Sequence, residues 1–377
     1  MKSYRTFTVL LLVLNAITAN AAPSRQAQSQ LEKMREQGRE EKWTFTTGYS
    51  PVMERTLAES TGLVRPTDWN KKAMFVTLKP KLQGAMPAQF DWRQQSQGLP
   101  PIKDQKSCGS CWAFATVGVF ESVLKIREWK TKSFSEQYLI SCNDEGYGCS
   151  GGWWAHRYHQ SPGAVMSSAF PYAAADVQCR ASLAHGDQVM SWAYVAGSGG
   201  TESTPEVDQI KQAIMDYGPV SVGVYADSRF KAYKGGVFNA CNGQSEPNHA
   251  VVLIGWDDNT NTWIMRNSWG TKWGEKGYMH IKYGCNGIGQ GASYVVYKAR
   301  CAPNADAGQD VVVHAGQSVR IGSKAIPGQT YHWTPEEGLD DPNLATPIAT
   351  PKGDTIYTVT ADTDCGTAEH RATVSVN

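Results

Sequence analysis

The sequence has few long hydrophobic runs and no region dominated by basic charge. Its 377 residues carry a formal net charge of +1, and no segment is basic enough to predict a nucleic-acid partner. No apolar stretch reaches the roughly 20 residues that a helix needs to cross a bilayer. We therefore expect neither a membrane span nor binding to nucleic acid.

The N-terminus has the pattern of an export signal. Lys2 and Arg5 precede the apolar run Phe7–Leu14, and Ala19–Ala21 provides a small-residue cleavage site, so that residues 1–21 would be removed. The alternative is the start of a buried helix. Export to the medium or the periplasm would favour disulfides among the nine cysteines. Because nine is odd, one thiol is left over.

Composition and periodicity divide the remainder into three parts. Residues 22–86 are polar and free of cysteine, with a helical pattern at Gln30–Lys42 and a strand-like alternation at Trp43–Gly48. They predict a pro-segment, with a small adaptor domain as the alternative. Residues 87–300 are richer in aromatic residues, glycine and cysteine. Residues 301–377 are acidic and contain short alternating segments, which predicts a small antiparallel β-sandwich.

Residues 87–300 change from helical to strand periodicity along the chain. Apolar spacing predicts helices at Cys111–Lys130, Ser135–Cys142 and Pro205–Tyr217. Runs separated by Gly, Asn and Asp turns then predict strands. Helices followed by strands indicate an α+β unit or two subdomains. The predicted strands are Val220–Tyr225, Ala250–Trp256, Thr262–Asn267, Gly277–Tyr283 and Tyr294–Lys298.

Four polar residues in this part have the chemistry of a nucleophilic site. Cys111 starts the first helix, where unpaired N–H groups favour the thiolate, the reactive form of cysteine. His249 precedes an apolar strand, Asn267 ends another, and Gln105 lies shortly before Cys111. A thiolate needs a base, a group that orients the base, and oxyanion donors. Taken singly, His249 would more often be structural and Asn267 a turn residue.

Cys108 and Cys111 also permit other interpretations. A redox dithiol would need a preceding strand and a thioredoxin-like unit, and it would leave the histidine and asparagine unexplained. A zinc site would need four clustered ligands, and the sequence has no second Cys-x-x-Cys. We therefore expect no metal site.

Blocks of this sequence resemble the papain-like (cathepsin-type) cysteine peptidases. They are Gln105 with Cys108-Gly-Ser-Cys-Trp112, then Asn248-His-Ala250, then Asn267-Ser-Trp-Gly270. Their distances from Cys111 are close to those of the family, with the last block slightly beyond. The resemblance implies a two-lobed α+β fold. A helical left lobe and a β-barrel right lobe would meet at the active-site cleft.

The resemblance also assigns roles to these residues. Cys111 would be the nucleophile, and His249 would form the ion pair with it and protonate the leaving amine. Asn267 would orient His249, with Trp269 shielding that contact from water. Gln105 and the Cys111 N–H would form the oxyanion hole. Residues expected to contact an extended peptide are Gly151, Gly152, Trp153, Trp154, Gly223, Asn248 and Trp269.

Disulfide pairs follow from the same resemblance. It implies Cys108–Cys149, Cys142–Cys179 and Cys241–Cys285, although Cys285 departs from the family's usual spacing by one residue. A pair Cys301–Cys365 would tie the entrance of the acidic part to its last hairpin. These pairs leave Cys111 free.

The function implied is that of a secreted or periplasmic cysteine endopeptidase, made as a zymogen. It would act on polypeptides as a monomer, without a metal or organic cofactor, and its own pro-segment would be the inhibitor. The pro-segment is short and lacks the long helical motif of cathepsin-L-type relatives, but Trp43 and Phe45 are expected anchors. Trp153 and Trp154 predict a bulky hydrophobic residue at the second position before the cut. The chain has no insertion of the cathepsin B type between Cys149 and Cys179, which favours an open cleft.

The acidic tail resembles bacterial PKD-like, immunoglobulin-type domains. The resemblance rests on segments such as Tyr331-His-Trp-Thr-Pro335 and Thr355-Ile-Tyr-Thr-Val-Thr360. It implies a spacer or a module that binds protein or polysaccharide, with a passive stabilising domain as the alternative. For the whole chain, the competing function is a catalytically inactive binding or adhesion protein on the same fold.

Overall fold

The computed structural model describes residues 22–70, 74–78, 86–197, 204–242, 246–297, 305–325, 329–363 and 366–377. The predicted export signal lies outside these residues, as do both cysteines of the predicted pair Cys301–Cys365. No helix of the described residues is long and apolar enough to cross a membrane.

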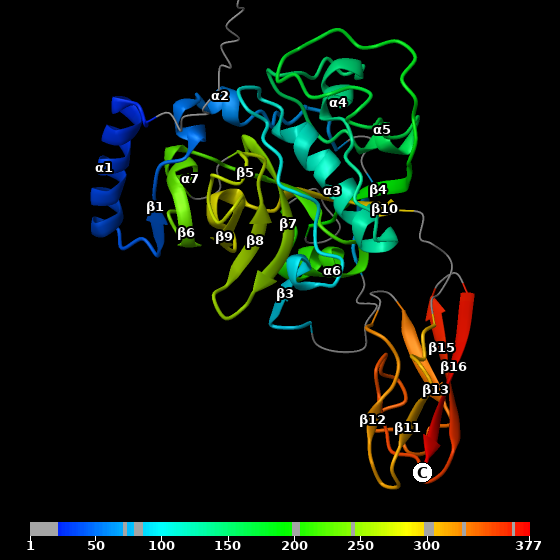
Figure 1. Cartoon of the computed structure of the whole chain (residues 1–377). Helices are drawn as coiled ribbons and strands as arrows, with labels where there is room; N and C mark the ends of the chain where they lie inside the picture. The colour runs from blue at the N-terminus through cyan, green and yellow to red at the C-terminus, as the bar shows by residue number, and fades with distance from the viewer. Residues whose placement is uncertain are drawn as a thin grey trace, which may run out of the picture.

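The described residues form an α+β body followed by a separate group of strands (Figure 1). The helices are α1 (Arg25–Glu40), α2 (Leu57–Ser60), α3 (Cys111–Glu128), α4 (Glu136–Cys142), α5 (His156–Gln160), α6 (Val207–Tyr217) and α7 (Ser228–Ala232), with short 3₁₀ turns η1 (Pro51–Glu54), η2 (Trp92–Gln94) and η4 (Cys285–Gly287). The strands of the first body are β1 (Phe45–Thr47), β2 (Phe75–Val76), β3 (Gln89–Asp91), β4 (Val189–Val195), β5 (Val220–Val224), β6 (Tyr233–Phe238), β7 (His249–Asp257), β8 (Thr262–Arg266), β9 (Tyr278–Lys282) and β10 (Gln290–Tyr297).

Helix α3 is the central helix of this body. Almost all of its residues are buried, so it is apolar around most of its circumference, as expected of a helix enclosed by other elements. It packs on β7, and at Gly118 an added Cβ would lie 3.6 Å from Val252. The helix and the strand are therefore in ordinary van der Waals contact at this position. The helix ends where Trp129 adopts a left-handed conformation (φ 61°) and its N–H bonds Lys125.

The first body is built on one ten-stranded sheet. Its strands follow the order β1-β6-β9-β8-β7-β5-β10-β4-β2, with β3 paired to β7. Among the described residues this path is not closed into a barrel. The two outermost strands, β1 and β2, both come from residues 22–86. The predicted pro-segment is therefore part of the sheet at both of its edges.

The C-terminal residues form two further sheets. Strands β11 (Val311–Val313), β16 (Gly366–Val376), β15 (Thr355–Thr363) and β13 (Thr330–Thr334) make the larger one, and β12 (Val319–Arg320) pairs with β14 (Ile348–Ala349). Trp333, Tyr357 and Val374 are buried between them. The prediction of a purely antiparallel arrangement is wrong for one pair, because β11 runs parallel to β16.

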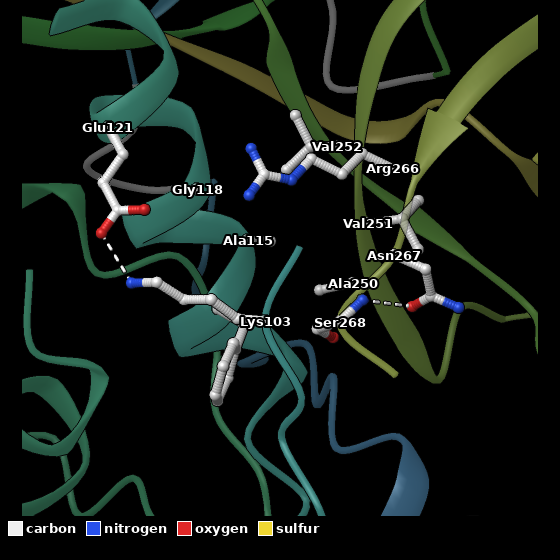
Figure 2. A pocket seen from close by; sticks show the side chains of 11 residues that line it. Lys103, Ala115, Gly118, Glu121, Ala250, Val251, Val252, Arg266, Asn267 and Ser268 are labelled. Carbon is white, nitrogen blue, oxygen red and sulfur yellow. Dashed lines mark hydrogen bonds and ion pairs between the residues drawn. The ribbon is translucent and has the colours of Figure 1, made fainter. Parts of the chain in front are cut away.

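A buried ion cluster fixes the segment before the predicted nucleophile. Lys103 Nζ lies 2.6 Å from Glu121 and 2.7 Å from Glu136, and both carboxylates are almost fully buried. Glu121 also accepts the N–H of Phe134 at 2.7 Å. Figure 2 shows Lys103 reaching Glu121 across the N-terminal half of α3. The cluster joins the 103–105 segment to α3 and α4.

We predict that Lys103→Ala lowers the free energy of unfolding by about 3–5 kcal/mol, because it leaves two buried carboxylates without their cation. Urea unfolding of the full chain, followed by tryptophan fluorescence, measures the change. Lys130→Ala is the matched control, since Lys130 is exposed and pairs with Glu128 at 3.3 Å, and it should change stability by less than about 1 kcal/mol. Equal losses in the two variants would contradict the prediction.

Candidate active site

The predicted nucleophile lies at the junction of α3 and β7. Cys111 is the first residue of α3, and its side chain is fully buried. The preceding Ser110 makes no side-chain cap bond, so the first N–H groups of the helix remain directed at this end. The Sγ atom accepts the N–H of Ala250 at 3.2 Å. Ala250 follows His249, and the thiol therefore lies against the start of β7.

His249 and Asn267 lie together because β7 and β8 pair antiparallel. The Nε2 atom of His249 is 2.8 Å from Oδ1 of Asn267, which also accepts the N–H of Ser268 at 2.8 Å. An amide oxygen can only accept, so Nε2 of His249 carries the proton. Its Nδ1 is buried and has no hydrogen-bond partner among the described residues. The Trp269 ring stacks on His249 at 4.7 Å and covers it.

Gln105 is held between the two parts of the site. Its Nε2 donates to the carbonyl oxygens of Thr61 (3.1 Å) and Cys108 (3.0 Å). Its Oε1 accepts the hydroxyl of Ser268 at 2.7 Å, and its backbone N–H donates to the Ser268 carbonyl at 2.8 Å. Ser268 was not predicted as a site residue, although it lies inside the block Asn267-Ser-Trp-Gly270. Its contact with Gln105 orients the amide so that Nε2 points at a carbonyl.

Residues 61–64 of the N-terminal segment lie against residues that the sequence predicts to contact a peptide. The N–H groups of Gly62 and Leu63 donate to the Asn248 carbonyl at 3.0 and 2.9 Å. Gly152 donates to Gly62 and accepts from Val64, both at 3.0 Å. The backbone of Gly152 therefore pairs with the N-terminal segment, and its contact with a substrate stays a prediction. A Cβ added at Gly62 would lie 1.9 Å from the Gly109 carbonyl oxygen.

The other predicted contact residues divide into two groups. Gly151 bonds Gly148 instead of the extended chain, but a Cβ on it would lie 2.5 Å from Val64. A Cβ on Gly223 would lie 3.1 Å from the Leu63 side chain. Trp154 donates from Nε1 to the Gly291 carbonyl at 2.8 Å, and Trp153 donates to the hydroxyl of Tyr194 at 2.7 Å.

Burial keeps both reactive groups neutral in this state. It raises the pKa of the Cys111 thiol to about 12. The hydrogen bond from the Ala250 N–H lowers this pKa, but by less than burial raises it. Burial lowers the pKa of His249 to about 4, partly offset by the bond to Asn267. At neutral pH the thiol is protonated and the imidazole uncharged. In this state the four predicted residues lie near one another, but the thiolate and imidazolium that the predicted reaction needs are not formed.

Three of the predicted disulfide pairs form in the structure. They are Cys108–Cys149, Cys142–Cys179 and Cys241–Cys285, and Cys111 is the free cysteine of the described residues. Those residues hold no group of three or more His, Cys, Asp or Glu side chains suited to a metal. A small cavity of about 20 Å³ lies behind the site, between α3 and the strands that carry Ala250 and Asn267 (Figure 2). It has room for about one water molecule and not for a substrate.

Comparison with known proteins decides the family. Residues 86–298 match the family described as papain family cysteine protease. The chain belongs to this family. Among papain-family relatives, cathepsin K from Gallus gallus is 34% identical over 254 residues, covering 64% of this chain and 69% of that protein. The viral cathepsin of a Cydia pomonella granulosis virus is 32% identical over 224 residues, covering 58% and 64% respectively.

A solved papain-family structure shows the same fold. The digestive procathepsin L2 proteinase from Tenebrio molitor larval midgut aligns with a TM-score of 0.62 and 29% identity, covering 74% of this chain and 96% of that chain. Matches to the viral cathepsin and to the senescence-specific protease SAG12 of Arabidopsis thaliana cover 64% and 62% of those proteins. The chain thus spans less than two thirds of their length.

We predict that Gly62→Ala exposes the thiol of the full chain. The added methyl would collide with the Gly109 backbone, so residues 61–64 would have to leave their position over Cys111. Iodoacetamide at pH 7 should then modify Cys111 at least about tenfold faster than in the unchanged chain, as read by peptide mapping. Gly353→Ala is the control, because a Cβ there meets nothing within 4 Å. An unaltered rate in Gly62→Ala would contradict the arrangement described here.

Proposed function

We propose that this chain is a secreted cysteine endopeptidase made as a zymogen. The observation that supports it is the bond from Gln105 Nε2 to the Thr61 carbonyl at 3.1 Å, made beside the contact that joins Cys111 to the residue after His249. A carbonyl bound in this way by Gln105 would mark the position of a scissile bond. No metal or organic cofactor enters the proposed reaction, because the four side chains provide a nucleophile, a proton carrier and an oxyanion donor.

In the proposed reaction the Cys111 thiolate attacks the carbonyl carbon of a substrate peptide bond. The N–H of Cys111 and Nε2 of Gln105 stabilise the oxyanion that forms. Protonated His249 then donates its proton to the leaving amine, the C–N bond breaks, and a thioester remains on Cys111. Water, deprotonated by His249, attacks the thioester, releases the new carboxylate and restores the thiolate. Asn267 acts as a positioning residue that keeps Nδ1 of His249 directed at the sulfur.

The chain direction of residues 61–64 supports their role as an inhibitor. Thr61 lies at the oxyanion donors, while Leu63 lies against Gly223, which we assign to the second pocket before the cut. Residue numbers therefore rise from the scissile position towards the second pocket. In a bound substrate, residue numbers fall from the scissile bond towards the second pocket. The segment runs opposite to a substrate and is poorly placed for cleavage.

Contacts on either side hold the segment in place. Arg55 forms a two-pronged ion pair with Asp104, next to Gln105, at 2.9 and 3.2 Å. Phe45 is buried against Tyr233 and Phe238, and the Trp43 ring stacks on it at 4.8 Å. We propose residues 22–86 as the pro-segment, with activation by cleavage near Met86, where the family match also begins.

The remaining assignments follow from the same proposal. The presence of Leu63 beside Gly223 favours a bulky hydrophobic residue at the second position before the cut. Disulfides at three places suit an exported, monomeric enzyme. We propose that residues 301–377 form a PKD-like domain that binds protein or polysaccharide.

Kinetics of the processed enzyme test the proposal. We expect Gln105→Ala to lower kcat about 10²–10³-fold on a short fluorogenic peptide, because one oxyanion donor is lost, and Cys111→Ala to abolish turnover. Gln188→Ala is the matched control, since this exposed side chain bonds the Pro162 carbonyl and no other group among the described residues, and its kcat should be unchanged. Hydrolysis that persists in Cys111→Ala would refute the assignment of the nucleophile.

A further inference from the structure

We propose that the processed enzyme has a second peptide-binding groove, which takes substrate residues on the N-terminal side of the cut. This groove is the surface that residues 69–70 and 74–78 now cover: the edge of β4 that pairs with β2, the rings of Trp153 and Tyr194, and the side chain of Gln209. It prefers an extended stretch that carries an aromatic and an aliphatic side chain. The inference rests on the proposed function, because the groove becomes accessible only when the pro-segment leaves.

The first part of the groove is an edge strand. Strand β4 pairs with β10 on one side and with β2 on the other, so removal of residues 75–76 leaves β4 at the edge of the sheet. The N–H of Tyr194 now donates to the Met74 carbonyl at 2.8 Å, and the N–H of Ala196 donates to Val76 at 3.0 Å. Both donors lose their partners on activation. An exposed strand edge of this kind pairs readily with another extended chain.

The second part is an aromatic slot beside that edge. Trp69 lies edge-on against Trp153 and Tyr194, with ring centroids 5.7 and 5.0 Å away, and Phe75 stacks on Tyr194 at 5.1 Å. Trp153 and Tyr194 are themselves almost fully buried and bonded to each other. Their mutual hydrogen bond does not involve the pro-segment, and we expect it to hold the two rings in place when the segment leaves. The vacated slot fits an aromatic side chain of a substrate.

The third part is an amide clamp on α6. Gln209 accepts the N–H of Leu78 at 2.9 Å with Oε1 and donates from Nε2 to the carbonyl of Leu78 at 3.2 Å. One side chain thus satisfies both polar groups of a single residue, as a neighbouring strand would. The Leu78 side chain is buried in the core that also contains Ile210. This arrangement binds any extended backbone and selects an aliphatic side chain.

The groove continues the substrate cleft in a defined direction. Along the pro-segment, the chain passes from the oxyanion donors at Thr61 to the second pocket at Leu63 and then to the slot at Trp69. Arg65 bridges the last two, with its guanidinium 5.4 Å from the Trp69 ring and 5.8 Å from the Trp153 ring. The surface beyond the second pocket therefore faces substrate residues that lie further on the N-terminal side of the cut. The favoured substrates are therefore long, unfolded polypeptides.

Three fluorogenic substrates with the same cleavable core test the inference on the processed enzyme. One has no extension, one has about twelve added N-terminal residues of Gly and Ser, and one has the same extension with a Trp or Phe and a Leu three residues apart. We expect the last to have a KM about tenfold lower than the unextended substrate, and the Gly and Ser extension, which offers only its backbone, to give a small part of that gain. Gln209→Ala and Gln209→Glu should each remove at least about half of that gain, whereas Gln188→Ala should keep it in full.

The KM values distinguish a failure of the groove from a failure of the proposed function. Equal KM values for the three substrates on the unchanged enzyme would overturn the groove, and so would a full gain in both Gln209 variants. An equal gain from the Gly and Ser extension and from the extension with the aromatic residue and Leu would overturn the aromatic slot. If the unextended substrate is not cleaved at all, the proposed function itself has failed, and that result is separate from a failure of the groove.

Discussion

The contact between the start of α3 and the start of β7 is the constraint on which the site depends. Cys111 begins the helix, His249 begins the strand, and the bond from the Ala250 N–H to the Cys111 sulfur joins them at 3.2 Å. The same helix and strand are in van der Waals contact further along, at Gly118 and Val252. Because the two residues are far apart in sequence, the proposed nucleophile and its proposed base come near each other only after both elements have folded together.

The N-terminal segment uses the same sheet that carries the site. It supplies the outermost strands, β1 and β2, and between them its chain crosses the catalytic residues. One element therefore covers two strand edges, at β6 and β4, and lies beside a thiol whose pKa is raised by burial. Removal of this segment would change the electrostatics of the site and the shape of the surface at the same time. Activation and substrate recognition are in this sense one structural event.

The sequence predicted well the features that depend on local patterns. The helix expected at Cys111–Lys130 spans Cys111–Glu128, and its end differs because Trp129 takes a left-handed turn. The blocks around Cys111, His249 and Asn267 lie together in the structure. Strand β6 was not predicted, because its Gly235-Gly236 pair interrupts the apolar alternation. The parallel pairing of β11 with β16 was also missed, since pairing direction is not encoded in a short alternating run.

Contacts made by the N-terminal segment could not be predicted from its sequence. The bond from Gln105 to Thr61 and the clamp of Gln209 on Leu78 join residues with no shared pattern. They arise because a strand edge accepts any extended chain, and the backbone that satisfies it has no sequence signature. Ser268, which holds the Gln105 amide, is hidden for a different reason. Its contact with Gln105 depends on how the segment that carries Gln105 folds against it.

The central claim is that Cys111 is latent under the N-terminal segment and activated when that segment leaves. The pH dependence of Cys111 alkylation, measured by mass spectrometry before and after removal of residues 22–86, tests it most directly. In the full chain, where burial raises the pKa of Cys111 to about 12 and lowers that of His249 to about 4, the rate should stay low through neutral pH and rise only in strong base. In the processed chain the rate should reach a plateau below pH 7, as an ion pair with His249 requires. Identical profiles for the two forms would contradict the account.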